Sequence, residues 1–205
     1  MKYTALIVTF NRLGKLKKTV EETLKLEFTN IVIVNNGSTD GTQAWLSSIV
    51  DTRVIVLTLT ENTGGAGGFK TGSQYICEQL ASDWVFFYDD DAYPYPDTLK
   101  SFSQLDKRGC RVFSGLVKDP QGKPCPMNMP FSRVPTSLGD TVRYLRYPGE
   151  FIPAANRSMF VQTVSFVGMV IHRDLLATSL DYIREQLFIY FDDLYFGYQD
   201  RKSVV

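Results

Sequence analysis

Three consecutive aspartates, Asp89, Asp90 and Asp91, directly follow the apolar run "WVFFY" at 84–88. A run of this kind is typical of a strand buried on both faces, so the three carboxylates are expected at its carboxyl end. Adjacent anions repel each other, and a divalent cation would offset that repulsion. Mg²⁺ and Mn²⁺ prefer carboxylate oxygens and usually keep waters or substrate phosphates as further ligands. A solvated acidic turn is the alternative interpretation.

A second acidic pair, Asp192 and Asp193, stands in "FDDLYFG" about a hundred residues later. Its alternative interpretation is an acidic helix start, which the helix dipole favours. His172, the only histidine, is interpreted as a surface or packing residue because the sequence shows no partner for it.

Two further segments are rich in small polar residues and glycine: "NNGSTDGT" at 35–42 and "GGAGG" at 64–68. Glycine-rich loops can cradle phosphates, since backbone N–H groups approach an anion where side chains are missing. The second segment lacks a P-loop lysine and the spacing of the dinucleotide fingerprint, which argues against a dehydrogenase. The local alternatives are a turn with an Asp or Thr N-cap for the first segment and tight packing for the second.

The first hundred residues alternate β-rich runs with helical patterns, which predicts a parallel sheet with crossover helices. Strands are expected at 3–10, 31–34, 53–59 and 84–88, and Asn11 is expected to be the N-cap of the first helix. Open parallel sheets bind ligands beyond the carboxyl ends of their strands. Each polar cluster follows such an end, and this coincidence is stronger than any single motif.

The chain changes character after residue 118. Seven of the nine prolines lie between 119 and 153, which predicts a long loop region because helix and sheet interiors exclude most prolines. A loop of this length is usually a binding segment or a lid, and a disordered insertion is the alternative. Strand character returns at 159–172.

The overall composition argues against several function classes. The 22 basic and 22 acidic residues cancel, so no global field favours nucleic acid or an anionic membrane surface. The three cysteines form no metal-ligand spacing, and the first residues do not resemble a signal peptide, which favours a reducing cytoplasm. No apolar stretch approaches the ~20 residues of a membrane span. Any membrane contact is therefore expected to be peripheral, at the inner face of the cell membrane.

Six segments, taken together, resemble family 2 glycosyltransferases, which have the GT-A fold. Their order and approximate spacing match over nearly the whole chain. The glycine-rich segment and the "YFDD" element are most similar to the branch that contains bacterial galactofuranosyl- and rhamnosyltransferases. The six segments are "TFNR", "VNNGSTDGT", "NTGGAGGF", "FFYDDDAYP", "FVGMVIHRDL" and "FIYFDDLYFG".

The resemblance implies one α/β domain over 1–205, with a mainly parallel sheet. Residues 1–118 would be the nucleotide-sugar and metal-binding half, and 119–205 the acceptor half. Asp89 and Asp91 would bind Mn²⁺ or Mg²⁺, and Asp193, with Asp192 beside it, would be the catalytic base. The nucleotide and the donor would contact Thr9, Asn11, Arg12, Asn35, Asp40, Asn62, Gly64, Gly65 and Asp90.

The implied activity is inverting, metal-dependent transfer of a sugar to a glycan or lipid-linked acceptor of cell-surface polysaccharide. A UDP-sugar is the favoured donor, with galactofuranose first and rhamnose next. One alternative is a nucleotidyltransferase that makes nucleotide sugars, which should carry a glycine-rich basic loop after the first strand, whereas "TFNRLGKL" has one glycine there. The other is a non-catalytic, nucleotide-binding remnant of a transferase.

The chain departs from the family pattern at three places. Asn35 replaces the aspartate that usually accepts from uracil, although an amide oxygen can also accept. Tyr195 and the pair Tyr198-Gln199 stand where the family commonly has an acid and a Leu-Arg pair. Family chains normally continue well beyond this element, which leads us to expect a C-terminal truncation.

Overall fold

The fold is taken from a computed structural model that describes residues 1–154 and 159–184. Within these residues a six-stranded sheet has the strand order β3-β2-β1-β4-β6-β5. The parallel strands are β1 (Tyr3–Thr9), β2 (Asn30–Asn35), β3 (Val54–Thr58) and β4 (Trp84–Asp89). Strand β6 (Met169–His172) runs antiparallel to β4 and to the short β5 (Val112–Ser114). The predicted α/β domain with a mainly parallel sheet is confirmed.

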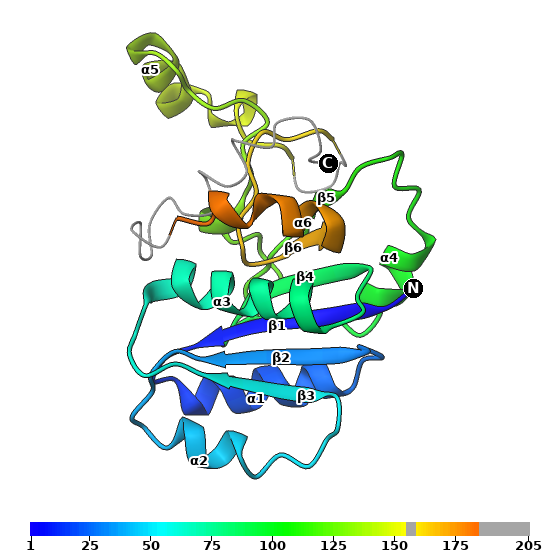
Figure 1. Cartoon of the computed structure of the whole chain (residues 1–205). Helices are drawn as coiled ribbons and strands as arrows, with labels where there is room; N and C mark the ends of the chain where they lie inside the picture. The colour runs from blue at the N-terminus through cyan, green and yellow to red at the C-terminus, as the bar shows by residue number, and fades with distance from the viewer. Residues whose placement is uncertain (155–158, 185–205) are drawn as a thin grey trace.

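Helices cover both faces of this sheet (Figure 1). One face packs against α1 (Leu13–Leu24), α2 (Thr42–Leu46) and α4 (Thr98–Gln104). The other face packs against α3 (Gly64–Gln79) and α6 (Arg173–Ser179). The sheet therefore has a hydrophobic core on each side, as parallel sheets generally do.

The strand that leads into the aspartates has its side chains shared between the two cores. Trp84, Phe86 and Tyr88 belong to the core under α1 and α4, whereas Val85 and Phe87 belong to the core under α3. All five are buried, which explains the uninterrupted apolar run in the sequence. The expected strand, with the aspartates at its carboxyl end, is confirmed.

The glycine-rich segment is not the loop ahead of a helix that its composition suggests. Helix α3 begins at Gly64, so the glycines form its first turns. A Cβ at Gly68 would lie 2.5 Å from Cγ1 of Val8, and a Cβ at Gly72 would lie 2.2 Å from Cδ1 of Leu6. These glycines thus let α3 pack closely on β1, in agreement with the packing alternative.

Replacing Gly68 with alanine is expected to destabilise the fold by up to about 2 kcal/mol in urea unfolding. Overpacking costs about 1–3 kcal/mol, from which about 1 kcal/mol of helix propensity must be subtracted. Val8 cannot easily move aside, because its branched side chain is restricted at χ1. The matched control is Gly14→Ala in α1, where no atom lies within 4 Å of the added Cβ. That variant should be unchanged or more stable by about 0.4–1 kcal/mol. A gain in stability in Gly68→Ala, as helix propensity alone would give, would contradict the packing argument.

The prediction of a continuous loop at 119–153 is wrong in part. The segment contains α5 (Leu138–Arg146) and two short 3₁₀ turns, η1 (Pro126–Asn128) and η2 (Pro148–Glu150). Residues 136–147 contain no proline, and the Ser137 hydroxyl caps α5 by accepting from the backbone N–H of Asp140 at 3.0 Å. A Ser-x-x-Asp start followed by apolar residues was the local signal for this helix.

The strand expected at 159–172 is also shorter than predicted, because only Met169–His172 joins the sheet. The preceding residues instead bind the proline-rich segment: Thr163 Oγ1 accepts from the Phe131 N–H at 2.8 Å, and Ser165 Oγ accepts from Asn128 Nδ2 at 3.1 Å. Helix α4, strand β5 and the 3₁₀ turn η3 (Leu180–Tyr182) were not predicted. Among the described residues, no helix has the length and hydrophobicity needed to cross a membrane.

Candidate functional site

The carboxyl ends of β1 and β4 are neighbours, and Asp90 connects the chain segments that follow them. The Thr9 hydroxyl donates to Asp90 Oδ2 at 2.8 Å, and the Thr19 hydroxyl of α1 donates to the Asp90 backbone carbonyl at 2.8 Å. Asp90 is only 3% exposed. This burial raises the pKa of the Asp90 carboxyl, while the Thr9 hydrogen bond and the charge of Arg12 act in the opposite direction.

Asp91, in contrast, faces solvent and is held by two cations. Arg12 Nη1 and Lys15 Nζ each lie 2.9 Å from the same oxygen, Asp91 Oδ2. Arg12 Nη1 also lies 3.4 Å from Asp90 Oδ1. The two cationic side chains are more than half exposed, so these ion pairs are screened by solvent and are weak. Both cations can therefore turn to another anion at small energetic cost.

Lys15 was missed by the sequence reasoning, although a local signal was present. It lies three residues after Arg12, and residues at this spacing lie on the same side of a helix. With Arg12 immediately before α1 and Lys15 in its first turn, both side chains reach the acidic cluster from the same direction.

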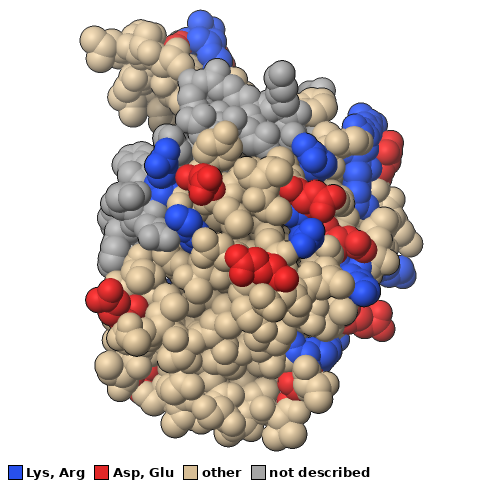
Figure 2. Space-filling view, in the orientation of Figure 1, with Lys and Arg blue, Asp and Glu red and all other residues tan. Residues whose placement is uncertain are grey.

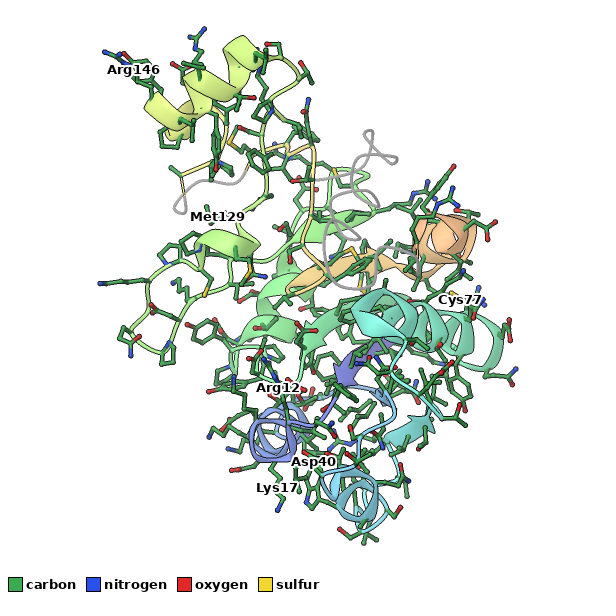
Figure 3. The ribbon with its side chains drawn as sticks, turned by 90° about the vertical axis from the view of Figure 1, so that its left-hand side faces the viewer. Arg12, Lys17, Asp40, Cys77, Met129 and Arg146 are labelled. Atoms are coloured by element: carbon green, nitrogen blue, oxygen red, sulfur yellow. The ribbon has the colours of Figure 1, made fainter. Side chains whose placement is uncertain are left out.

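The loops after β1 and β2 are fastened together by Asp40. Its Oδ2 accepts from the backbone N–H of Leu13 at 3.0 Å, and its Oδ1 accepts from the Thr42 N–H at 3.2 Å and from the Thr42 hydroxyl at 2.6 Å. These hydrogen bonds, that of the Thr42 hydroxyl first, hold the pKa of Asp40 below its ordinary value. Figure 3 shows Asp40 and Arg12 close to α1.

The expectation that Asn11 caps α1 is wrong, since Asp40 accepts from the first N–H of that helix instead. Asn11 has a left-handed backbone (φ 53°), which asparagine tolerates better than most residues. Its Oδ1 accepts from the Thr39 N–H at 2.7 Å, and its own N–H donates to Ser38 Oγ at 3.0 Å. Asn11 therefore also ties the two loops together.

The side chain of Asn35 lies almost fully buried at the end of β2, with 1% exposure. Its Nδ2 donates to Gln43 Oε1 at 2.8 Å, and its Oδ1 accepts from the Ser38 N–H at 3.1 Å. An amide oxygen has two lone pairs, of which Ser38 uses one. The expected contact between Asn35 and the base stays a prediction.

The buried neighbour Asn36, which the sequence reasoning did not single out, joins the loop after β2 to the start of α3. Asn36 Nδ2 donates to Asn62 Oδ1 at 3.0 Å and to the Gly64 carbonyl at 2.8 Å, and its Oδ1 accepts from the Thr63 N–H at 3.0 Å. Asn62 Oδ1 also accepts from the Gly64 N–H at 2.9 Å. Asn62, Gly64 and the adjacent Gly65 are thus held beside the loop 35–42, as one donor site would require.

The carboxylates at the end of β4 fit a divalent ion chemically, although the described residues contain no group of three possible metal ligands. Mg²⁺ is often held by one or two carboxylates while substrate phosphates and waters supply the rest. Asp89 and the exposed Asp91 can supply such a pair. Asp192 and Asp193 lie outside the described residues. The metal and base assignments stay predictions.

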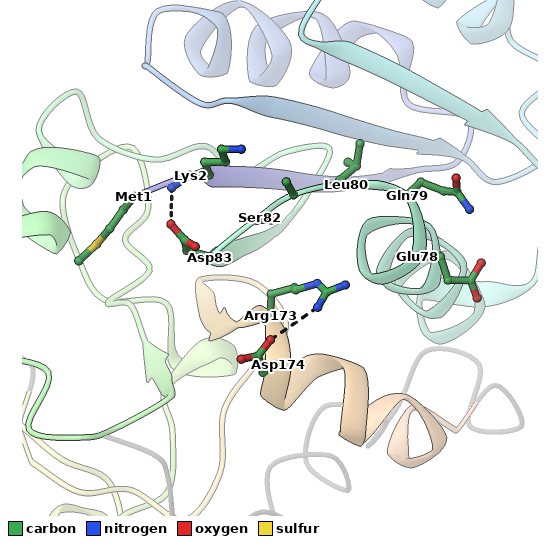
Figure 4. A pocket seen from close by; sticks show the side chains of 10 residues that line it. Met1, Lys2, Glu78, Gln79, Leu80, Ser82, Asp83, Arg173 and Asp174 are labelled. Atoms are coloured by element: carbon green, nitrogen blue, oxygen red, sulfur yellow. Dashed lines mark hydrogen bonds and ion pairs between the residues drawn. The ribbon is translucent and has the colours of Figure 1, made fainter.

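A hollow of about 670 Å³ lies at the opposite edge of the sheet (Figure 4). It surrounds Lys2 and Asp83, which directly precede β1 and β4, together with Arg173 and Asp174 at the start of α6. Two polar contacts lie within it: the Lys2 backbone N–H donates to Asp83 Oδ2 at 2.7 Å, and Arg173 Nη1 lies 3.6 Å from Asp174 Oδ1. Open α/β sheets bind ligands at the carboxyl ends of their strands, so the donor site is still expected at that end and not in this hollow.

Comparison with known proteins places this arrangement in a family. Residues 4–164 match the family described as "Glycosyl transferase family 2", and the chain belongs to that family. Its mostly parallel sheet matches the GT-A fold of glycosyltransferases, as the sequence motifs implied. A comparison with curated protein sequences gives no significant match.

Solved structures agree with this fold. The chain is similar to S. aureus TarS 1–349, with a TM-score of 0.68 and 19% identity, covering 100% of this chain and 57% of that one. TarS 1–349 in complex with UDP-GlcNAc gives a TM-score of 0.64 at 19% identity, covering 100% and 56%. A 4-diphosphocytidyl-2C-methyl-D-erythritol synthase from Anaerococcus prevotii gives 0.55 at 14% identity, covering 100% and 86%. The chain thus spans little more than half of the TarS structures that it matches.

Proposed function

We propose that this chain transfers a sugar from a nucleoside-diphosphate donor to a hydroxyl acceptor, with Mn²⁺ or Mg²⁺ as cofactor. The observation that carries the proposal is the arrangement of Asp90 and Asp91 against Arg12 and Lys15 at the strand ends of a family 2 fold. Carboxylates for a cation and cations for an anion stand within one small cluster. A diphosphate bound together with a metal ion needs both carboxylates for the metal and cationic side chains for the phosphates.

In this proposal Asp89 and Asp91 would hold the metal ion, which when bound would offset the charge of the departing diphosphate. Arg12 and Lys15 leave Asp91 and turn to the phosphate oxygens. Arginine and lysine both suit this role, arginine through its planar fork and lysine as a mobile point charge. The buried hydrogen bonds that Asp90 accepts from Thr9 and Thr19 keep the strand end rigid while these side chains exchange partners.

The nucleoside is proposed to lie over the loops that follow β1 and β2, which Asp40 and Asn11 join by hydrogen bonds. Asn11, Asn35 and Asp40 would border the base and ribose, and Asn62, Gly64 and Gly65 would border the donor sugar. The division into a donor half, 1–118, and an acceptor half, 119–205, follows from this placement. The proposed catalytic base is Asp193, beside Asp192.

We further propose UDP as the nucleotide, consistent with the complex of TarS with UDP-GlcNAc. The sequence motifs favour galactofuranose, then rhamnose, as the sugar. The acceptor is proposed to be a glycan or a lipid-linked glycan of the cell surface, reached from the cytoplasmic side.

Incubation with Mn²⁺ and a panel of nucleotide sugars, followed by measurement of released nucleotide, tests the proposal. The panel should contain UDP-galactofuranose, UDP-GlcNAc, dTDP-rhamnose and GDP-mannose, with and without a mixed glycan acceptor. We expect a nucleoside diphosphate to be released from one UDP-sugar, faster when acceptor is present. A variant with Asp89 and Asp91 both changed to alanine is the inactive control.

The alternative activity is that of a nucleotidyltransferase. The fold is also similar to that of the 4-diphosphocytidyl-2C-methyl-D-erythritol synthase, so this alternative is tested in parallel. A nucleotidyltransferase would instead release pyrophosphate from a nucleoside triphosphate and a sugar 1-phosphate. A parallel pyrophosphate assay therefore separates the two classes. Nucleotide binding without either product would identify a non-catalytic binding module.

A further inference from the structure

Helix α5 exposes its apolar side chains rather than burying them. Leu138, Val142 and Leu145 recur at i, i+4 and i+7, so they form one stripe along the helix. Their exposed fractions are 88%, 65% and 76%. A surface helix normally turns such a stripe toward the core. We refer to these three residues as the α5 stripe.

The opposite, more polar side of the same helix contacts the neighbouring residues 131–133 and 150–151. Tyr144 packs between Phe131 and Phe151, with ring centroids 5.6 and 5.7 Å apart. Asp140 pairs with Arg133 at 2.5 Å, and Arg143 pairs with Glu150 at 2.6 Å. These contacts fix the rotation of α5, so the helix cannot bury its stripe without breaking them.

The position of α5 makes the stripe accessible. The helix stands out at one extremity of the molecule, far from α2 at the other end (Figure 1). In Figure 2 this extremity is a protrusion of mainly uncharged surface with basic and some acidic atoms beside it. Arg146 ends the helix, and no acidic partner of Arg146 is found among the described residues. The half-exposed Tyr147 follows it, with the guanidinium carbon 5.7 Å from the ring centroid.

We propose that the α5 stripe docks on the surface of an anionic lipid bilayer. Leu138, Val142 and Leu145 enter the boundary between headgroups and acyl chains, while Arg146 and Tyr147 remain at the level of the headgroup phosphates. An apolar stripe flanked by arginine and an aromatic ring has the chemistry of an interfacial helix. The patch is small, so the binding is weak and reversible.

A second copy of the chain fits this stripe less well. Full burial of an aliphatic side chain is worth about 1.5–3 kcal/mol, which at about 25 cal/mol per Å² corresponds to roughly 60–120 Å² of apolar surface. The three side chains of the α5 stripe therefore offer about 200–350 Å². A standard protein interface buries about 800 Å² on each partner. A bilayer needs no matching surface and adds attraction to each exposed cation near anionic headgroups.

Cosedimentation with vesicles tests this proposal, using the whole 205-residue chain without donor or metal. Vesicles of phosphatidylcholine alone are compared with vesicles containing equal parts of phosphatidylglycerol. We expect binding to the anionic vesicles, weakened by roughly tenfold or more in Leu145→Asp because the charge must enter the apolar boundary. Arg146→Gln should weaken binding to anionic vesicles by a few fold and leave binding to neutral vesicles unchanged.

The matched control is Val50→Asp, which places the same charge at a residue that is 91% exposed near α2. It should bind like the wild type. Circular dichroism of each variant checks that the fold is kept, and Val142→Ser provides a milder change in the same stripe.

Equal binding of wild type and Leu145→Asp, or no binding of the wild type, would overturn the proposal. A dimer in sedimentation velocity that Leu145→Asp abolishes would assign the stripe to a second copy instead. None of these readouts depends on sugar transfer, so the proposal stands apart from the proposed function.

Discussion

Changing Asp193 to asparagine is expected to lower sugar transfer by ~100-fold or more, the usual scale for loss of a general base. Asparagine has nearly the same shape but cannot take the proton of the attacking hydroxyl. Donor and metal affinity should stay nearly unchanged, because the proposed donor contacts come from the segments that follow β1, β2, β3 and β4. Transfer rate and UDP affinity are measured on the same preparation, so the two effects can be separated.

Asp192→Asn is the matched control for this experiment. Neighbouring residues do not face the same way on a helix, so only one of the pair is expected to point at the acceptor. The control should be milder. Wild-type transfer by the Asp193 variant would refute the assignment, and an inactive Asp192 variant would move the base by one residue.

The second large effect is expected at Asp91, which offers an exposed carboxylate beside the buried Asp90. In the wild type, chelation should weaken UDP binding by roughly tenfold or more, because a diphosphate bound without metal has only Arg12 and Lys15 to offset its charge. Asp91→Ala should bind UDP equally with and without Mn²⁺. Titration calorimetry with and without chelator measures both effects.

Lys15→Ala is a second variant for the same experiment, because Lys15 pairs with the Asp91 carboxylate that would also bind the proposed metal ion. Its removal should strengthen Mn²⁺ binding in the absence of nucleotide, measured by the loss of the free-ion signal in electron paramagnetic resonance. UDP binding should still depend on metal in this variant. If the wild type binds UDP equally with and without chelator, Asp91 is not a metal ligand.

Most strands of the sheet could be predicted from the sequence, because each forms from a continuous run of mainly apolar residues. The four apolar runs ending near Thr9, Asn35, Thr58 and Asp89 predicted the parallel strands. Strands β1, β2 and β4 are buried on both faces and are therefore mostly apolar, whereas β3 at the edge of the sheet is only partly buried. The polar clusters behind them were expected to meet, because parallel strands bring their carboxyl ends to one edge, and hydrogen bonds do join the segments at the ends of β1, β2 and β4. Shorter elements such as β5 and α4 escaped, since a few residues carry too little periodicity.

Only the tertiary structure decided which partner each polar residue takes. Asp40 caps a helix that begins 27 residues earlier in the chain, and Asn36 binds Asn62, which is 26 residues later. No spacing rule predicts such pairs, because they depend on how the strands are ordered in the sheet. Likewise, the sequence contains the apolar residues of α5, but the packing of Tyr144 on Phe131 and Phe151 turns them outward. The pattern of residues determined the helices and strands, and long-range packing determined which of their faces bind the protein and which remain exposed.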